Sequence, residues 1–251
     1  MAPRAARRRP VPLDEERIVD AAFVILDAEG FERLTIRRIA ERLRVQNPAL
    51  YWHFESKQRI VDRMAERMLV EMASSARASN PSGWRTVLQA AARSFRRVMR
   101  GRRDGARVVA AADLSRSPMI ASMGETLELL VAAGFPERDA LIGVIAVFDY
   151  TMGATFEEQE DPRRSPATRR SLDPAPSAGG ETAASALLAR AVGSLGGDGD
   201  AVFEGGLELL LDGLGVRLRR PRPRRSRGDP RPPRRPRSSS SSGSRRRARR
   251  S

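Results

Sequence analysis

The segment Thr35–Lys57, TIRRIAERLRVQNPALYWHFESK, determines the fold that we predict for the N-terminal part of this chain. Its first half has apolar side chains at the i, i+3, i+4 and i+7 spacing of an amphipathic helix, at Ile36, Ile39, Ala40 and Leu43. Thr35 stands in front of this stripe as an N-cap, and Ser56 is placed to cap the helix that follows the segment.

The second half of the segment predicts another short helix. After a turn at residues 44–46, the helix begins with Asn47 as the expected N-cap and Pro48 as the first helical residue. Two short helices joined by a tight turn form a helix-turn-helix, whose second helix enters the major groove of DNA.

Apolar periodicity predicts further helices on both sides of this segment. One precedes it at residues 14–29, and one follows it with a row of apolar side chains at Ile60, Met64, Met68 and Met72. Beyond a break at residues 80–83, we expect helices at residues 84–100, 106–114, 118–133, 137–158, 183–195 and 201–216. Residues 161–182 are rich in Pro, Gly and Ser, and we expect a functional or disordered loop there.

The net charge of +15 resides in the C-terminal tail. Residues 217–251 contain 16 Arg and one Asp, so the remaining residues are formally neutral, with 30 of the 46 basic and 30 of the 31 acidic side chains. The tail has almost no apolar side chains, and we expect it to be disordered. Residues 1–12 form a second basic arm, which is either a solvated disordered terminus or an arm that contacts phosphates or the minor groove.

The composition argues against several classes of site. There is no cysteine and only one histidine, His53, so disulfides, thiol nucleophiles, His-based triads and multi-His metal sites are excluded. No enzyme motif is recognisable, and we expect no catalytic activity, no cofactor and no bound metal. The longest uncharged stretch, residues 140–148, is too short to cross a bilayer, and the N-terminus lacks the apolar part of a signal peptide. We therefore expect a cytoplasmic protein that is associated with the nucleoid when bound to DNA.

The order of residues from Leu34 to Lys57 resembles the DNA-binding head of the TetR family of bacterial transcriptional repressors. LYWHFESK is its most specific part, and PALYWH is similar to the branch that contains the tetracycline repressor. The segments SGWRTVLQAAARSFRRVM, RRDGARVV, GATFEEQE and FEGGLELLLDGL resemble the regulatory domain of that branch. The resemblance covers about residues 13–216 and implies an all-α fold. A three-helix helix-turn-helix DNA-binding domain (residues 13–60) would precede a helical-bundle domain for ligand binding and dimerisation (residues 61–216).

The resemblance also implies which residues contact DNA. Arg37 would read guanine, because Arg is bidentate to O6 and N7, and Asn47 would pair with adenine where the tetracycline repressor has the longer Gln. Pro48 and Tyr51 would contact thymine methyl groups, and other residues would bind phosphates. The expected set is Thr35, Arg37, Asn47, Pro48, Ala49, Tyr51, Trp52, His53 and Lys57. The alternative is that Tyr51 and Trp52 are core aromatics.

A turn residue departs from the family pattern. Arg44 occupies a position where the family usually has Gly. If the backbone there has positive φ, Arg costs about 1 kcal/mol relative to Gly.

The expected effector site also departs from the family prototype. The tetracycline repressor binds a drug–magnesium chelate through polar side chains, and the matching positions here are Ala73, Ala91, Val109, Ala112 and Glu125. Phe95 and Glu157 look retained, although Glu157 could equally lie at a solvated helix end. We expect the ligand-binding residues to be Phe95, Val109, Ala112, Glu125, Phe148 and Glu157, and the effector to be small, largely apolar and free of metal.

Two open choices concern assembly and function. The apolar stripes of residues 137–158 and 201–216, which include Leu141, Ile145, Phe203, Leu207, Leu210, Leu211 and Leu214, belong either to the intramolecular core or to a homodimer seam, and we favour the seam. The favoured function is a transcriptional repressor that a small molecule releases from a palindromic operator in double-stranded DNA. The alternative is a protein that compacts nucleic acid without sequence preference through its Arg-rich tail.

Overall fold

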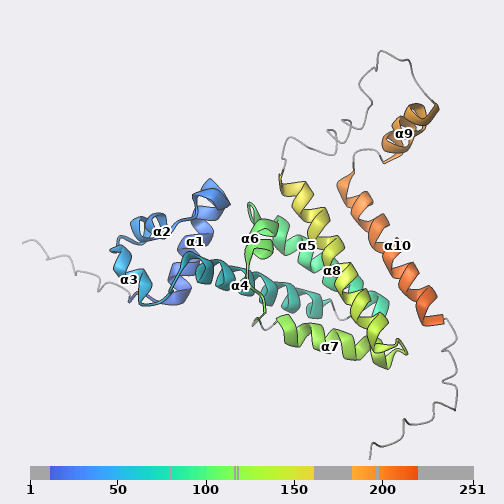
Figure 1. Ribbon diagram of the computed structural model, residues 1–251, viewed down its shortest axis with the longest axis horizontal. Helices are drawn as coiled ribbons and strands as arrows, with labels where there is room; N and C mark the ends of the chain where they lie inside the picture. Colours follow the sequence, from blue (N-terminus) through green and yellow to red (C-terminus); the bar gives the residue numbers. More distant parts are fainter. Residues whose placement is uncertain are drawn as a thin grey trace, which may run out of the picture. The chain divides into compact units, whose positions relative to one another are not determined.

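The computed structural model describes residues 12–79, 81–115, 117, 119–160, 183–195 and 198–219. All regular secondary structure in these ranges is helical (Figure 1). The elements are α1 (Glu15–Glu29), η1 (Phe31–Arg33), α2 (Ile36–Leu43), α3 (Asn47–Tyr51), α4 (Lys57–Ala78), α5 (Trp84–Arg100), α6 (Gly105–Ala111), α7 (Met119–Ala132), α8 (Glu137–Glu160), α9 (Ala183–Ser194) and α10 (Gly199–Arg219). The predicted all-α class is confirmed. The predictions for residues 1–11, 161–182 and 220–251 lie outside the described residues.

The helix-turn-helix is formed by α2 and α3, and local hydrogen bonds define its ends. Thr35 Oγ1 accepts from the Arg38 amide at 3.2 Å, and Ser56 Oγ accepts from the Arg59 amide at 3.3 Å, so both predicted N-caps are confirmed. The turn residue Arg44 adopts the left-handed conformation, with φ 57° and ψ 42°. The sequence therefore holds Arg where Gly would be unstrained.

The predicted start of α3 is wrong by one residue. Gln46 is the N-cap, its side chain makes no capping bond, and Asn47 is already helical. Pro48 is tolerated one position later than expected because the N–H groups of the whole first turn lack intrahelical partners.

The described helices enclose two clusters of buried side chains. The first cluster forms the core of the DNA-binding head, where it includes Ile18, Leu26, Ile39 and Leu50. It continues along α4 to side chains of α5 and α6. Met64 and Met68 are fully enclosed in it, and Met72 packs against its edge, so the predicted Met row of α4 is core packing. Helix α4 thus joins the helix-turn-helix to the regulatory helices through one continuous apolar contact.

The second cluster corrects the prediction for α10. Its core side chains come from α5, α7, α8 and α10, together with Phe135 between α7 and α8, and the contributions of α10 are Phe203, Leu207, Leu211 and Leu214. These four were predicted to form the subunit seam, but they are buried within the chain against α8. They pack inward because Gly143 and Gly206 let α8 and α10 approach closely. An added Cβ at Gly206 would lie 2.1 Å from the Tyr150 hydroxyl.

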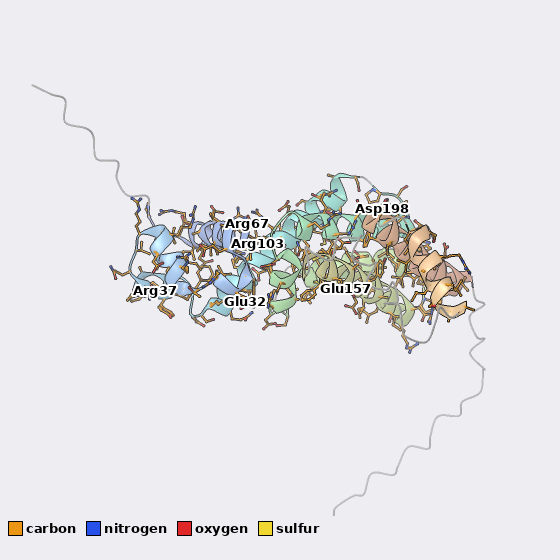
Figure 2. The ribbon with its side chains drawn as sticks, turned by 90° about the horizontal axis from the view of Figure 1, so that it is seen from above. Glu32, Arg37, Arg67, Arg103, Glu157 and Asp198 are labelled. Carbon is orange, nitrogen blue, oxygen red and sulfur yellow. The ribbon has the colours of Figure 1, made fainter. Side chains whose placement is uncertain are left out.

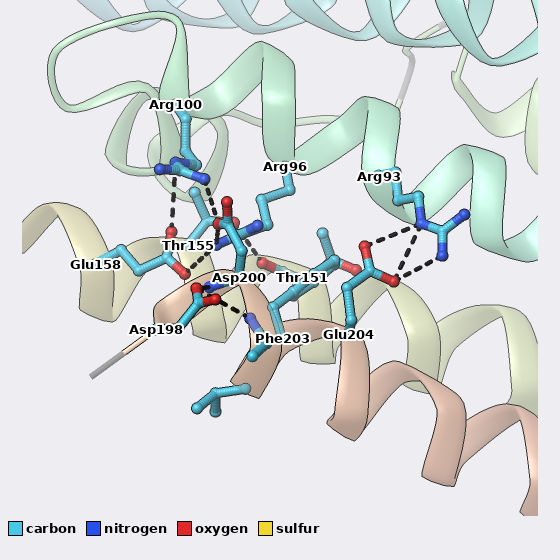
Figure 3. Close-up of polar contacts among 12 residues, drawn as sticks. Arg93, Arg96, Arg100, Thr151, Thr155, Glu158, Asp198, Asp200, Phe203 and Glu204 are labelled. Atoms are coloured by element: carbon cyan, nitrogen blue, oxygen red, sulfur yellow. Dashed lines mark hydrogen bonds and ion pairs between the residues drawn. The ribbon is translucent and has the colours of Figure 1, made fainter. Parts of the chain in front are cut away.

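Charged and polar side chains connect α5 to α10, and Figure 3 shows the part of this contact around Arg93, Arg96 and Arg100. The α5–α10 ladder consists of Arg85 with Glu208 and Asp212, Gln89 with Glu208, Arg93 with Glu204, and Arg96 and Arg100 with Asp200. Arg96 is the buried member, with 9% of its side chain exposed, and also pairs with Glu158 of α8 at 2.8 Å. Hydrogen bonds from Arg96 and Arg100 lower the pKa of Asp200, which favours its charged form.

The end of α10 differs by a few residues from the sequence prediction. Helix α10 continues to Arg219 instead of ending at residue 216, because Leu218 packs against the second cluster and Arg217 pairs with Asp139 at 3.0 Å.

By length and composition alone, residues Glu137–Gln159 of α8 could cross a membrane. Core helices of water-soluble proteins meet the same criterion, and α8 buries Ala140, Val144 and Val147 in the second cluster.

Candidate DNA interface and effector cavity

Helix α3 presents two aromatic side chains to solvent. Leu50 is fully buried and anchors the helix, whereas Tyr51 is 55% exposed and Trp52 is 87% exposed. Tyr51 and Trp52 are therefore not core aromatics, which removes the alternative interpretation of these residues. Exposed aromatic rings on a short, anchored helix are available for contacts with bases or phosphates.

The residues predicted to contact DNA lie together on one end of the described chain. Thr35, Arg37, Asn47 and Pro48 are exposed, and Ala49, His53 and Lys57 are half-buried. Arg37 projects from α2, as Figure 2 shows, with 81% of its side chain exposed. The Lys57 ammonium lies 5.0 Å from the centre of the Phe31 ring, which holds it at the start of α4. The α2–α3 surface thus gathers donors and aromatic groups of the kind that base and phosphate contacts require.

A set of polar contacts joins this head to the turn between α5 and α6. Arg102 pairs with Asp27 at 2.8 Å, and Arg103 donates to the Ala28 carbonyl at 2.8 Å. Asp104 accepts from the amide of Phe31 at 2.7 Å, and Gly30 leaves the space that the Asp104 carboxylate occupies. These contacts are not predictable from local sequence patterns, because the partners are more than seventy positions apart.

A cavity of about 500 Å³ lies between α4, α5, α7 and α8. Its volume falls within the range of about 300–1,000 Å³ that is usual for small-molecule sites. Its wall is mostly apolar and includes Met72, Ala73, Leu88, Ala91, Phe95, Met123, Leu129, Val144, Val147 and Phe148. The rings of Phe95 and Phe148 stack with centroids 4.6 Å apart and form a flat aromatic part of the wall.

The structure brings half of the predicted ligand-binding residues to this cavity. Phe95, Glu125 and Phe148 line it, but Val109, Ala112 and Glu157 do not. Val109 and Ala112 pack instead into and against the first cluster, and Glu157 lies on an exposed part of α8 (Figure 2). These three expectations are therefore not met for the cavity.

The polar groups of the cavity wall were missed except for Glu125. Arg77 of α4 pairs with Glu125 of α7 at 3.3 Å, and Thr126 and Thr151 complete the polar set. Apolar spacing identifies the buried face of a helix, but it does not show which part of that face borders an empty space. Within the described ranges, no group of three or more His, Asp or Glu side chains is placed to hold a metal ion.

Comparisons with known proteins agree with this architecture. Residues 18–64 match the sequence family described as bacterial regulatory proteins of the tetR family, and residues 78–218 match the tetracyclin repressor-like C-terminal domain. The tetracycline repressor protein class C of Escherichia coli is 36% identical over 206 residues, which cover 80% of this chain and 90% of that protein.

Solved structures show the same relationship. A possible TetR family transcriptional regulator from Streptomyces coelicolor A3(2) superposes with a TM-score of 0.69 at 33% identity, over 81% of this chain and 99% of that one. A single-residue variant of TetR from Acinetobacter baumannii AYE, in complex with minocycline, superposes with a TM-score of 0.62 at 30% identity, over 82% and 99% of the two chains. The chain therefore belongs to the TetR family of bacterial regulatory proteins.

Proposed function

We propose that this protein is a cytoplasmic transcriptional repressor that binds a palindromic operator as a homodimer and leaves it when a largely apolar small molecule fills the cavity. The observation that carries the DNA-binding part is the exposure of Tyr51 and Trp52 on α3, directly after the buried anchor Leu50. The phenol of Tyr51 at the end of α3 and the indole of its C-cap Trp52 lie largely outside the core of the described residues. They fit a helix that lies in the major groove.

Two kinds of DNA contact follow from the α2–α3 surface. Arg37, Asn47, Pro48, Ala49 and Tyr51 are placed to read base edges and thymine methyl groups. The phosphate contacts are assigned to Thr35, Trp52, His53 and Lys57. Phosphate contacts fix the orientation of the head but carry no sequence information.

The homodimer is supported by apolar side chains that remain exposed on α8 and α10. Leu141, Ile142 and Ile145 of α8 are between 40% and 44% exposed, and on α10 Leu209 is 75% and Val216 47% exposed. Among the described residues, no atom outside the local backbone lies within 4 Å of a Cβ added at glycines 153, 205 and 213. The seam is therefore the opposite face of α10 from the one predicted by sequence. A second copy would cover these side chains and place two reading heads on one duplex.

The effector assignment is supported by the chemistry of the cavity. Ala73 and Ala91 line it where the tetracycline repressor has polar side chains, and Val109, at the position of the metal ligand, packs away from it. A magnesium chelate needs oxygen or imidazole ligands around the ion, and the described wall offers one carboxylate, Glu125, which is already paired with Arg77, besides the neutral hydroxyls of Thr126 and Thr151. The wall fits an apolar or aromatic compound instead, with the Phe95–Phe148 pair as its flat contact.

Helix α4 supplies the route from the cavity to DNA. Its last two turns contribute Met72, Ala73, Ala76 and Arg77 to the cavity wall, and its first residue is Lys57. A ligand that binds more tightly when α4 is in one position would increase the population of that position. The DNA-binding head moves with α4, so the distance between the α3 helices of the two subunits would change. This requires no contact between effector and DNA.

The test is selection of bound sequences from a random duplex library, followed by a release screen on the selected operator. We expect a palindromic sequence, and release by apolar compounds in the presence of a chelator. Binding to any duplex with a steep salt dependence that depends on residues 220–251 would instead support the nucleic-acid compaction function. Release by tetracycline with magnesium, lost on chelation, would contradict the effector assignment.

A further inference from the structure

Two neighbouring arginines on α2 share Glu41 as a partner, but only Arg38 also pairs with a residue outside this helix. Arg38 pairs with Glu29 at the end of α1 and, at 3.6 Å, with Glu41, so it connects α2 to α1. Arg37 pairs with Glu41 alone, and its Nε donates to Glu41 Oε1 at 2.8 Å. Both side chains of this second pair are exposed, Arg37 by 81% and Glu41 by 47%. The Arg37–Glu41 pair therefore has no role in joining helices to one another.

The atoms used in this pair leave the reading edge of Arg37 free. A guanidinium has five N–H donors in a planar fork, and the bond to Glu41 uses the donor on Nε. Within the described part of the chain, the two terminal nitrogens of Arg37 make no other hydrogen bond or ion pair. These terminal nitrogens can donate two parallel bonds to O6 and N7 of guanine while Nε stays bound to Glu41.

A carboxylate on this surface is unfavourable for binding DNA in general. Phosphates repel it, and its own helix already carries the cationic side chains that bind phosphates non-specifically. The hydrogen bond from Arg37 lowers the pKa of Glu41, which favours the charged carboxylate. A carboxylate at this position would weaken contacts with any duplex, while its bond to Nε favours one orientation of Arg37; such a combination raises specificity at the expense of affinity.

We propose that Glu41 is a specificity-determining positioning residue, which holds Arg37 in the orientation that reads a guanine and prevents Arg37 from binding phosphates instead. This inference rests on the proposed function, because it requires a sequence-specific operator. Glu41 acts through Arg37 and need not contact DNA itself.

The experiment compares full-length variants on the selected operator and on the same operator with each base pair substituted in turn. Arg37→Ala first identifies the base pair that Arg37 reads, as the position where discrimination is lost. We expect Glu41→Gln to lose roughly two- to tenfold of the discrimination at that base pair only, the scale on which ordering one long side chain affects binding. Its affinity for unrelated duplex should rise, with a salt slope steeper by up to about one, because Arg37 becomes free to bind a phosphate.

The matched control is Glu29→Gln, which removes the α1 partner of the neighbouring Arg38 and leaves Glu41 in place. It should leave the base preference of the operator unchanged. A double variant, Arg37→Ala with Glu41→Gln, should have the same base preference as Arg37→Ala alone, because the side chain through which Glu41 acts is then absent. This is a result that a general effect of Glu41 on the fold of the head would not give.

Three results would overturn the inference. Glu41→Gln could keep wild-type discrimination at the base pair that Arg37→Ala identifies, it could change discrimination equally at all positions, or its effect could persist in the Arg37→Ala background. In each case the wild type still prefers one operator, so the proposed function stands. A wild-type protein without any base preference would instead overturn the proposed function and this inference together.

Discussion

The DNA-reading surface and the effector cavity are built in opposite ways. The reading surface comes from one continuous segment, residues 35–57, and its side chains are exposed on two short helices. The cavity takes its wall from four helices, between Met72 and Thr151, and its side chains face inward around a shared space. A substitution on the reading surface can therefore change one DNA contact and little else, whereas a substitution in the cavity also changes how α4, α5, α7 and α8 pack.

The largest effect should come from the subunit seam, on which both regions depend. We expect Leu209→Glu to produce monomers, because a charge would lie in the apolar contact between subunits. Loss of the second head should weaken operator binding by about 10²–10⁴-fold, the scale of avidity from two linked sites. Sedimentation and operator binding measure both effects. A monomeric wild type at micromolar concentration would contradict the assignment.

Substitutions of base-contacting residues should give the next largest effect. They test whether the DNA-reading surface can be changed without affecting the packing of the rest of the chain. Arg37→Ala and Tyr51→Ala should each lose about 1–3 kcal/mol of discrimination at their own base pair, because each removes one contact with a base edge or methyl group. Both side chains are exposed, so thermal melting should be almost unchanged. Wild-type base preference in either variant would show that the wrong face of the head had been assigned to DNA.

A cavity substitution should give the converse result. Ala91→Phe fills space next to Phe95 and should weaken the response to the releasing compound by roughly tenfold, since overfilling an apolar site costs about 1–3 kcal/mol. Operator affinity without effector should stay within about twofold, because no reading side chain has moved. The measurement is the compound concentration that releases half of the bound operator. An unchanged release concentration would place the effector outside this cavity.

The smallest effect should come from a phosphate contact. Lys57→Ala should weaken all sequences alike and reduce the salt slope by about one, since one phosphate contact is lost. Titrations at several salt concentrations on the operator and on an unrelated duplex measure this. A loss of affinity that depends on one base pair would show that Lys57 contacts a base. It would contradict the assignment of Lys57 to phosphate.

The DNA-reading surface was more predictable from sequence than the cavity was. The helix-turn-helix was predictable because Thr35, Ser56 and the apolar spacing of α2 act within a few residues of one another. Asn47 was misplaced because capping preferences do not resolve the two positions around a proline. The face of α10 was misassigned because Leu207 and Leu209 are equally apolar, and only the close approach of α8 at Gly206 decides which of them is buried. Val109 was misplaced because lining a cavity depends on distant helices.

The α5–α10 ladder has a consequence for the timing of synthesis. All buried members of the first cluster have been made once the ribosome passes Val109, but the second cluster needs side chains as far as Leu214. At about 5–20 residues per second, this difference of roughly a hundred residues corresponds to about 5–20 s. During that interval Leu88, Val144 and the arginines of α5 await the residues that will cover them. The DNA-binding head can therefore fold well before the second cluster is complete. The growing chain is most exposed to aggregation and proteolysis after α8 has been synthesised and before α10 has been.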